Sequence, residues 1–342
     1  MFKKSNASFI IQRMKAQVRG KLKSRRKNKM AQELPLVSIV TPSLNKGGFI
    51  EENILSVKNQ TYPRIEHIVI DGGSTDKTLD ILQKYSDSII WTSEPDSGQS
   101  DAMNKGWRVA KGEIVAVLDA DDTYMPGAVE TAVRFLAEHP DVDMVYGKCN
   151  IINEHSKVVG QCPVTEFDLA EMICNRCEVP EPAVFLRKRI LDDIGYFDIS
   201  LYLAMDFDLW IRIGLRCKIK YIPQLLANFR RYPGTKSVDE AYKAGPEYFY
   251  ILNKLFSNPE LPKEVRALKR RAYSCAYLRT GWGHCSQGQM KQARRHLIKS
   301  VMLYPWHFRE PLMAGTLITS FIGRRATEIA SNWRSKLGGR WS

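Results

Sequence analysis

Short apolar runs rich in β-branched residues alternate along the first half of the chain with segments whose apolar residues recur every three or four positions. The first pattern is typical of buried strands and the second of helices that cover a sheet. The predicted strands are 36–40, 65–70, 88–91, 113–118 and 142–146, and the predicted helices are 49–59, 77–85, 101–110 and 126–139. Because the strand runs are apolar throughout, the pattern predicts an α/β fold with a mostly parallel, Rossmann-like central sheet flanked by helices.

The pattern becomes looser after residue 150. A helix is predicted at 206–214, a strand at 219–222 and a loop rich in Arg and Gly at 228–238, and helical signals dominate from about residue 245. The spacing of small and aromatic residues over 272–305 resembles one tetratricopeptide-type helix pair. One such pair cannot form a solenoid, which needs about three repeats. We therefore expect a C-terminal helical subdomain that packs on the α/β body.

Polar residues directly follow three of the predicted strands. They are Thr41 and Pro42 after the first strand, Asp71 and Gly72 after the second, and the segment 119–122 after the fourth. In an open parallel sheet, ligands bind at the carboxyl ends of the strands. The sequence therefore predicts a ligand site at this edge of the sheet.

Asp119 and Asp121 are separated by one residue and follow a buried strand. On an extended chain their side chains point the same way, so both carboxylates can converge on one cation, while Asp122 points elsewhere or caps the next helix. Mn²⁺ and Mg²⁺ take carboxylate oxygens as ligands and share them with phosphates. Asp119 and Asp121 therefore form a candidate metal site for the pyrophosphate of a nucleoside diphosphate sugar.

Asp206 lies among Leu203, Met205 and Phe207. A carboxylate in such apolar surroundings is partly desolvated, which raises its pKa and suits it to act as a general base. It is the candidate catalytic residue, taking the proton from an acceptor hydroxyl. The alternative is that Asp206 caps the following helix, a role that Asp208 fills equally well.

The net charge of +14 is concentrated at the N-terminus. Residues 1–34 carry eleven Lys and Arg and one acidic residue, a net charge of +10 that leaves only +4 for the rest. This basic arm fits an anionic membrane surface, a nucleic acid or simple solvation. A possible apolar stripe within 1–30 favours the membrane surface over nucleic acid, and a disordered tail is an equal alternative. The stripe consists of Phe9, Ile10, Ile11, Met14 and Val18.

Seven scattered cysteines, an odd number, indicate reduced thiols in the cytosol. Cys174 and Cys177 form one C-x-x-C, but a structural zinc site needs a second ligand pair at suitable spacing, and no second C-x-x-C exists. No apolar run approaches the roughly 18 residues that span a bilayer, the late stretch 312–322 included, and no signal-peptide pattern opens the chain. We expect a cytoplasmic protein, either soluble or peripheral on the inner face of the plasma membrane.

Several motifs, in a fixed order over about residues 35–240, resemble those of the family 2 glycosyltransferases, which are inverting enzymes of the GT-A fold. The motifs are Val37-Ser-Ile-Val-Thr-Pro-Ser-Leu-Asn45, Ser56-Val-Lys-Asn-Gln-Thr61, Val69-Ile-Asp-Gly-Gly-Ser-Thr-Asp76, Asp101-Ala-Met-Asn-Lys-Gly106, Ala110-Lys-Gly-Glu-Ile114, Leu118-Asp-Ala-Asp-Asp122, and Gly195-Tyr-Phe-Asp198 followed by Met205-Asp206. The resemblance implies a nucleotide-sugar donor, most often a UDP-sugar, and a glycan or lipid-linked acceptor. Within the family, the chain resembles members that act in bacterial surface polysaccharide or lipopolysaccharide assembly.

The resemblance also implies roles for single residues. Thr41 and Asp71 would contact the nucleoside, Asp119 would lie near the ribose or the metal, Asp121 would bind the metal, and Asp206 would be the base for inversion. Arg230 and Arg231 are candidate pyrophosphate contacts. The remaining candidate nucleotide-binding residues are Pro42, Ser43, Asn45, Gly72 and Asn104.

The implied organisation has a basic arm, a GT-A domain and a helical region. The ranges are 1–34 for the arm, 35–240 for the GT-A domain with a nucleotide-binding half at 35–150 and an acceptor half at 151–240, and 245–342 for the helical region. Two departures from the family pattern stand out. Gly72 occupies a position where many members have a second acidic residue, and Tyr232 replaces a common His in the loop after the base. The Gln-x-x-Arg-Trp motif of processive synthases is absent, so we expect transfer of one or few sugars per encounter.

Two other functions are weighed against the transferase. A sugar-1-phosphate nucleotidyltransferase would need a Gly-rich, basic phosphate loop after the first strand, and 41–48 is a poor version of one. A non-catalytic nucleotide-sugar or nucleic-acid binder is disfavoured because Asp119, Asp121 and Asp206 are all present. The nearly neutral body also leaves little surface for nucleic acid beyond the arm.

Overall fold

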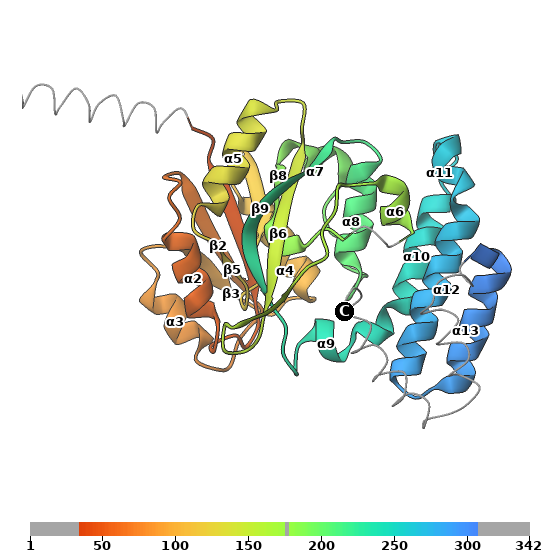
Figure 1. Cartoon of the computed structure of the whole chain (residues 1–342). Coiled ribbons are helices and arrows are strands. Elements are labelled where there is room, and N and C mark those ends of the chain that lie inside the picture. Colours follow the sequence, from red (N-terminus) through yellow and green to blue (C-terminus); the bar gives the residue numbers. More distant parts are fainter. Residues whose placement is uncertain (1–33, 175–177, 307–342) are drawn as a thin grey trace, which may run out of the picture.

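The computed structural model describes residues 34–174 and 178–306 (Figure 1). The predictions for the basic arm, its membrane binding, Cys177 and the apolar stretch 312–322 fall outside the described residues. Within the described residues, no helix is both long and apolar enough to cross a membrane.

The described residues form one curved sheet with nine strands in the order β3-β2-β1-β4-β8-β6-β9-β5, with β7 paired to β6. The first four strands are parallel, as the apolar runs predict. The strands are β1 (Val37–Ser43), β2 (Ile65–Asp71), β3 (Ile90–Ser93), β4 (Ile114–Val117), β5 (Thr123–Tyr124), β6 (Met144–Ile152), β7 (Val158–Gln161), β8 (Val184–Arg187) and β9 (Ile219–Arg230). The α/β fold class and the central sheet flanked by helices are confirmed.

The second half of the sheet departs from the simple parallel pattern. The strand expected at 142–146 is the start of β6, but it does not lie beside β4. β8 lies between them and pairs antiparallel with both β4 and β6. β8 spans only four residues, a length at which an apolar run cannot be distinguished from a helix segment by its pattern.

Helices cover both faces of the sheet, because each strand in its centre has apolar side chains on both sides. One core cluster packs α5 against Val37, Ile39 and Leu118, and another packs α4 and α8 against Val40 and Val117. The main helices are α2 (Ile50–Lys58), α3 (Thr78–Lys84), α4 (Gln99–Val109), α5 (Ala128–Glu138), α6 (Leu169–Ile173), α7 (Arg189–Ile194), α8 (Met205–Gly214), α9 (Lys236–Asp239), α10 (Gly245–Phe256), α11 (Lys263–Ala267), α12 (Lys269–Ser286) and α13 (Met290–Leu303), with 3-10 turns η1 (Glu181–Ala183) and η2 (Ala241–Ala244).

The C-terminal helices α10 to α13 stack beside α8, on the side of the molecule away from α2 and α3 (Figure 1). The predicted helix pair at 272–305 corresponds to α12 and α13. The two helices approach closely at Gly281, where an added Cβ would lie 2.8 Å from Leu297. Ser274 and Ser300, both fully buried, donate hydroxyl hydrogen bonds to each other's carbonyls at 2.7 and 2.8 Å.

One predicted loop is wrong in part. The segment 228–230 belongs to β9, where Ile152 of β6 stands opposite Arg230. Asn228 is paired on both sides, accepting from Asn150 and donating to Thr123 at 3.0 Å each. The polar composition that suggested a loop therefore reflects cross-strand hydrogen bonds inside the sheet.

Thr41 on β1 hydrogen-bonds through its hydroxyl to Nε2 of His67 on β2 at 2.9 Å, and both side chains are buried. Burial lowers the pKa of His67 from 6.5 to about 3, because the charged imidazolium would be desolvated. The folded protein therefore binds fewer protons at His67 than the unfolded chain does at any pH between these two values.

This difference predicts a pH-dependent effect of His67→Gln. As the pH falls below 6.5, the unfolded wild-type chain gains a proton at His67 that the folded state does not, so wild-type stability falls by up to 1.4 kcal/mol per pH unit. Gln lacks this proton. Chemical denaturation at pH 7 and pH 4 should show wild type losing about 3 kcal/mol relative to the variant. A difference that stays constant with pH would contradict the neutral buried histidine.

Candidate active site

Strands β2, β1 and β4 are neighbours, so their carboxyl ends form one edge of the sheet. β2 ends at Asp71 and β1 at Ser43, which stand opposite each other in register, and the Gly72 amide donates to the Ser43 carbonyl at 2.8 Å. β4 ends at Val117, just before the turn 119–122. The polar segments that follow these strands in the sequence therefore lie along one edge.

Asn53 of α2 holds the turn that contains Asp119 and Asp122. Its side chain is fully buried, and its amide nitrogen donates to the carbonyls of Asp119 at 2.9 Å and Asp122 at 3.1 Å. Its Oδ1 accepts the Thr41 hydroxyl at 3.4 Å. Buried carbonyls need a donor from the protein when water is excluded, and Asn53 provides one donor group for two of them.

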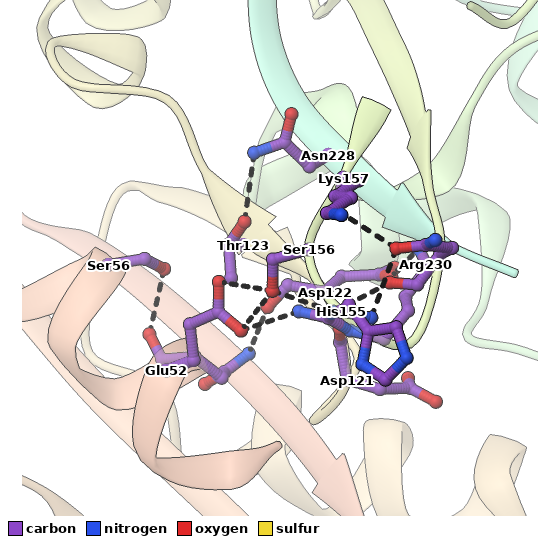
Figure 2. Close-up of polar contacts among 12 residues, drawn as sticks. Glu52, Ser56, Asp121, Asp122, Thr123, His155, Ser156, Lys157, Asn228 and Arg230 are labelled. Atoms are coloured by element: carbon purple, nitrogen blue, oxygen red, sulfur yellow. Dashed lines mark hydrogen bonds and ion pairs between the residues drawn. The ribbon is translucent and has the colours of Figure 1, made fainter. Parts of the chain in front are cut away.

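Arg230, at the end of β9, holds the same turn from the other side (Figure 2). Its Nε donates to the Asp121 carbonyl at 2.7 Å, one terminal nitrogen donates to the Asn153 carbonyl and the Ser156 hydroxyl at 2.9 Å each, and the other contacts Glu52 at 2.6 Å. The side chain is fully buried. Its backbone amide donates to Asp122 at 2.7 Å, and its guanidinium lies 4.9 Å from the ring centre of Phe49.

Asp119 is held by Gln99, the first residue of α4. Both carboxylate oxygens of Asp119 accept from the Gln99 amide nitrogen, at 2.9 and 2.8 Å. Lys236 of α9 donates to the Gln99 carbonyl oxygen and to the Tyr202 carbonyl. Burial raises the pKa of Asp119 to about 6, the charge of Asp121 acts in the same direction, and Lys236 opposes both.

Asp121 forms an ion pair with Lys46, whose Nζ lies 2.5 Å from Asp121 Oδ2, and the same oxygen accepts the Tyr232 hydroxyl at 3.3 Å. Burial disfavours the charged form of Lys46, but the Asp121 carboxylate outweighs it and raises the pKa of Lys46 to about 12. Lys46 is therefore a fixed positive charge beside Asp121. Tyr232, at the position where many relatives have a His, takes part in this contact, and its hydroxyl is 3.3 Å from Lys46.

Carboxylate oxygens at Asp119 and Asp121 are suitable ligands for a hard divalent ion. Among residues 34–174 and 178–306, however, no group of three or more His, Cys, Asp or Glu side chains could hold a metal. An ion here would need ligands from phosphate oxygens and water in addition to the protein. The donor set therefore fits a metal that is bound together with a nucleotide.

Asp206 lies in the first turn of α8 and is half-buried. Burial raises the pKa of its carboxyl, while the Phe207 amide and the charge of Lys236 lower it. Its Oδ1 accepts from the Phe207 amide at 2.7 Å, whereas the N-cap position of α8 is Ala204. Asp208 instead pairs with Arg212 at 2.7 Å. Neither aspartate therefore occupies the N-cap position, although Asp206 does accept a first-turn amide of α8.

Glu181, at the start of η1, is an acidic residue of the site that the sequence analysis missed. Its Oε1 is buried without a hydrogen-bond partner in the described residues. Burial raises the pKa of Glu181 well above its usual range, and the charges of Asp119 and Asp206 raise it further, with Lys236 opposing. The charges of Asp119 and Asp206 therefore both act on Glu181, and Lys236 acts on all three carboxyl groups. The Pro-Glu-Pro segment 180–182 was the available signal, because a carboxyl between two prolines is held in a rigid turn.

The predicted nucleoside contacts Asp71 and Ser43 stand at the carboxyl ends of β2 and β1. Asp71 is fully buried, and its carboxylate accepts from the amides of Gly73 and Ser74 and from two hydroxyls, those of Ser74 and Ser93. It shapes the turn after β2. The Ser43 hydroxyl, by contrast, is buried with no partner in the described residues.

Pro42 is buried in β1, and Asn45 lies on the exposed loop after it. Asn45 has a left-handed φ of 52°. Its backbone amide donates to the Ser74 hydroxyl at 2.7 Å, and its side-chain oxygen accepts the Thr75 amide at 2.9 Å. The loop after β1 is thereby fastened to the turn after β2.

Three side chains predicted to contact the ligand instead form hydrogen bonds inside the protein. The Thr41 hydroxyl is fully buried and bonds to His67 and Asn53. The Asn104 amide is buried and pairs with the backbone of Phe197, donating at 2.9 Å and accepting at 3.0 Å. Arg230 uses its guanidinium inside the protein.

The remaining predicted pyrophosphate contact, Arg231, is half-buried. Its charge acts on Glu178 and Cys162. The contact of Arg231 with pyrophosphate stays a prediction.

Comparison with known proteins identifies the family. The sequence model of "Glycosyl transferase family 2" matches residues 38–195. An uncharacterized glycosyltransferase of Mycobacterium tuberculosis is 30% identical over 254 residues, covering 66% of this chain and 96% of the relative. A PGL/p-HBAD biosynthesis glycosyltransferase of Mycobacterium bovis is 28% identical over 207 residues, covering 58% of this chain and 78% of the relative.

Solved structures share the fold at low sequence identity. Residues 1–349 of S. aureus TarS, crystallised with UDP-GlcNAc, superpose with a TM-score of 0.60 at 20% identity, covering 82% of this chain and 87% of that one. The mannosyltransferase PcManGT from Pyrobaculum calidifontis, in complex with GDP-Man and Mn²⁺, gives a TM-score of 0.58 at 18% identity, covering 84% and 86%.

The α/β sheet, the acidic edge and these matches together define a glycosyltransferase of the GT-A fold. The chain belongs to glycosyl transferase family 2 and is a nucleotide-sugar glycosyltransferase.

The buried contacts of Arg230 predict that Arg230→Gln destabilises the fold by about 3–5 kcal/mol, because it leaves buried acceptors around the Asp121 turn without donors. The adjacent Arg231→Gln is the matched control and should cost less than about 1 kcal/mol. Urea denaturation of both variants measures the difference. Equal costs for the two substitutions would show that Arg230 does not hold the turn.

Proposed function

We propose that this enzyme transfers a sugar from a UDP-sugar to an acceptor hydroxyl with inversion at the anomeric carbon. The observation that carries the proposal is that Lys236 acts on the carboxyl groups of both Asp119 and Asp206, while the neighbouring Asp121 is paired with Lys46. The presence of UDP-GlcNAc in the TarS structure supports a nucleotide-sugar donor, and GDP-Man in PcManGT leaves the choice of base to experiment.

The nucleoside lies over Ser43 and Gly72, the ribose next to Asp119, and the pyrophosphate next to Asp121. When bound, Mn²⁺ or Mg²⁺ would neutralise the leaving pyrophosphate through Asp121 and Asp119. Lys46 can also neutralise charge on the leaving pyrophosphate, because its ammonium lies 2.5 Å from Asp121. Once Asp121 has another partner, the Lys46 ammonium is free to donate to a phosphate oxygen.

Asp206 acts as the general base. The acceptor oxygen attacks the anomeric carbon while its proton passes to the Asp206 carboxylate, and the bond from that carbon to the phosphate oxygen breaks with its electrons on the nucleoside diphosphate. Attack opposite the leaving group inverts the anomeric centre. Partial desolvation raises the basicity of Asp206, and Lys236 limits how far its pKa rises.

Burial raises the pKa of Glu181, and the charges of Asp119 and Asp206 raise it further. The raised pKa favours the protonated carboxyl group, which can donate a hydrogen bond to a sugar hydroxyl without adding a third negative charge beside Asp119 and Asp206. It therefore serves to orient the reacting sugars.

The acceptor is proposed to be a glycan or lipid-linked sugar in cell-surface polysaccharide or lipopolysaccharide assembly. The name of the mycobacterial relative, a PGL/p-HBAD biosynthesis glycosyltransferase, supports a role in a biosynthetic pathway. A basic arm within residues 1–30 would bring a cytoplasmic enzyme to an anionic inner membrane surface. Nucleic acid is not proposed as a partner, because the chain outside the arm is nearly neutral.

Asp206→Asn should lower kcat by about 10²–10⁴-fold, because proton transfer by a placed base contributes that much, while nucleotide affinity stays unchanged. The exposed Asp192→Asn is the control and should retain wild-type rates. In wild type, the acid limb of kcat/KM should lie above the ordinary Asp range of about 4, because the pKa of Asp206 is raised and the ionised form is required.

Lys236→Gln removes a charge that lowers the pKa of Asp206, so it should move this acid limb to higher pH. An unshifted limb in Lys236→Gln, or wild-type kcat in Asp206→Asn, would rule out Asp206 as the base.

Asp121→Ala should abolish metal-dependent nucleotide binding. A ligand that binds only the folded state raises the melting temperature in proportion to its affinity. Wild type should therefore be stabilised by UDP with Mn²⁺ or Mg²⁺ more than by UDP alone, and Asp121→Ala should show no metal effect. The exposed Asp87→Ala serves as the control. Equal stabilisation of wild type with and without metal would contradict a metal role for Asp121.

A further inference from the structure

Gly72, directly after β2, lies against the carboxylate of Asp96. A Cβ placed on Gly72 would stand 2.7 Å from Asp96 Oδ2, 3.1 Å from its Cγ and 3.4 Å from its Oδ1. The Asp96 carboxylate therefore fills the volume that a side chain at position 72 would enter. This is the position where many family members have a second acidic residue and this chain has none.

The backbone at Gly72 does not require glycine. Its neighbour Gly73 has a φ of 87°, in the left-handed region, but Gly72 has no such conformation. The obstacle to a side chain at 72 is therefore Asp96 itself. A carboxylate reaches this place from the segment before α4 rather than from the end of β2.

Asp96 has one oxygen fixed and one available. Oδ1 accepts the Gly98 amide at 2.8 Å, which anchors the side chain at the start of α4. Oδ2 accepts no hydrogen bond from the described residues, and the side chain is half-buried, so it remains open to a ligand. Gln99, three residues after Asp96, donates a hydrogen bond to the Asp119 carboxylate. One short segment thus links the Gly72 end of the site to Asp119.

The position along the sheet edge shows which part of a nucleotide Asp96 would meet. β2 is two strands from β4, so Gly72 lies roughly 10 Å from the Asp119–Asp121 turn at the usual strand spacing. A ribose and a base together span such a distance when the pyrophosphate lies at Asp121. A carboxylate beside the pyrophosphate would repel it, whereas at this distance it faces a neutral base. The buried Ser43 hydroxyl, unpartnered in the described residues, lies at the same end.

We propose that Asp96 is the specificity residue for the donor nucleobase, with Oδ2 accepting a hydrogen bond from a ring N–H in place of the acidic residue that Gly72 lacks. The inference rests on the proposed nucleotide-sugar function. It selects bases with a ring N–H donor, which are uracil, thymine and guanine. Cytosine and adenine present a ring nitrogen lone pair there, which the carboxylate repels.

The test is calorimetric titration of the full-length enzyme with UDP, dTDP, GDP, CDP and ADP in the presence of Mn²⁺. Asp96→Ala should weaken the best binder of the first three by about tenfold or more, the worth of a hydrogen bond to a charged group. The ratio of the affinity for that nucleotide to the affinities for CDP and ADP should shrink by a similar factor. Glu94→Gln, an acidic neighbour on the same loop that pairs with Lys105, is the matched control and should bind like wild type.

Two further variants separate this role from a loss of structure. Asp96→Asn can turn an amide N–H toward a ring lone pair, so CDP should bind it better than it binds wild type. Gly72→Asp alone should weaken binding, because its Cβ would stand 2.7 Å from Asp96 Oδ2 and displace that oxygen, and because it sets a second carboxylate beside the first. The double variant Gly72→Asp with Asp96→Ala returns the carboxylate to β2 and should recover the base preference.

The outcomes distinguish this inference from the function on which it rests. If wild type binds a nucleotide but Asp96→Ala leaves both affinity and base preference unchanged, the role of Asp96 is refuted and the transferase proposal stands. If wild type binds none of the five nucleotides, the proposed donor site fails and this inference fails with it.

Discussion

The turn 119–122 depends on the buried guanidinium of Arg230, its hydrogen bonds and its ion pair with Glu52. This one side chain joins the turn at Asp121, the loop at Asn153 and Ser156, and helix α2 at Glu52, which come from distant parts of the chain (Figure 2). Losing one partner would leave buried groups unsatisfied, at a larger cost than any surface pair contributes. Together with Asn53, Arg230 fixes the backbone from which Asp119 and Asp121 project.

On that fixed backbone, the site collects negative charge that the protein must balance. Asp119, Glu181 and Asp206 raise one another's pKa or share the same lysine, and Asp121 is paired with Lys46. Lys236 is the common cation of the first three. Such a concentration of carboxyl groups beside two lysines is typical of a functional site rather than of a structural ion pair.

The chain departs from the family pattern at two positions, 72 and 232. Where the family pattern has a second acid after β2, this chain has Gly72, and Asp96 occupies the space. Where relatives have a His after the base, Tyr232 contacts Asp121 and Lys46. At the first place the carboxylate comes from another segment, and at the second the replacing residue itself makes the polar contacts.

The sequence alone determined the alternating elements, the sheet edge with its three polar segments, the family, and Asp119, Asp121 and Asp206 as the candidate chemistry. These features are local: strand periodicity, residue spacing and motif order are all written along the chain. The tertiary structure decided the rest. It placed β8 between β4 and β6, moved Thr41, Asn104 and Arg230 from ligand contacts to internal hydrogen bonds, and brought Glu181 and Lys236 to the site. Burial and charge contacts of this kind join residues far apart in the chain, and spacing along a single sequence does not encode which of them meet.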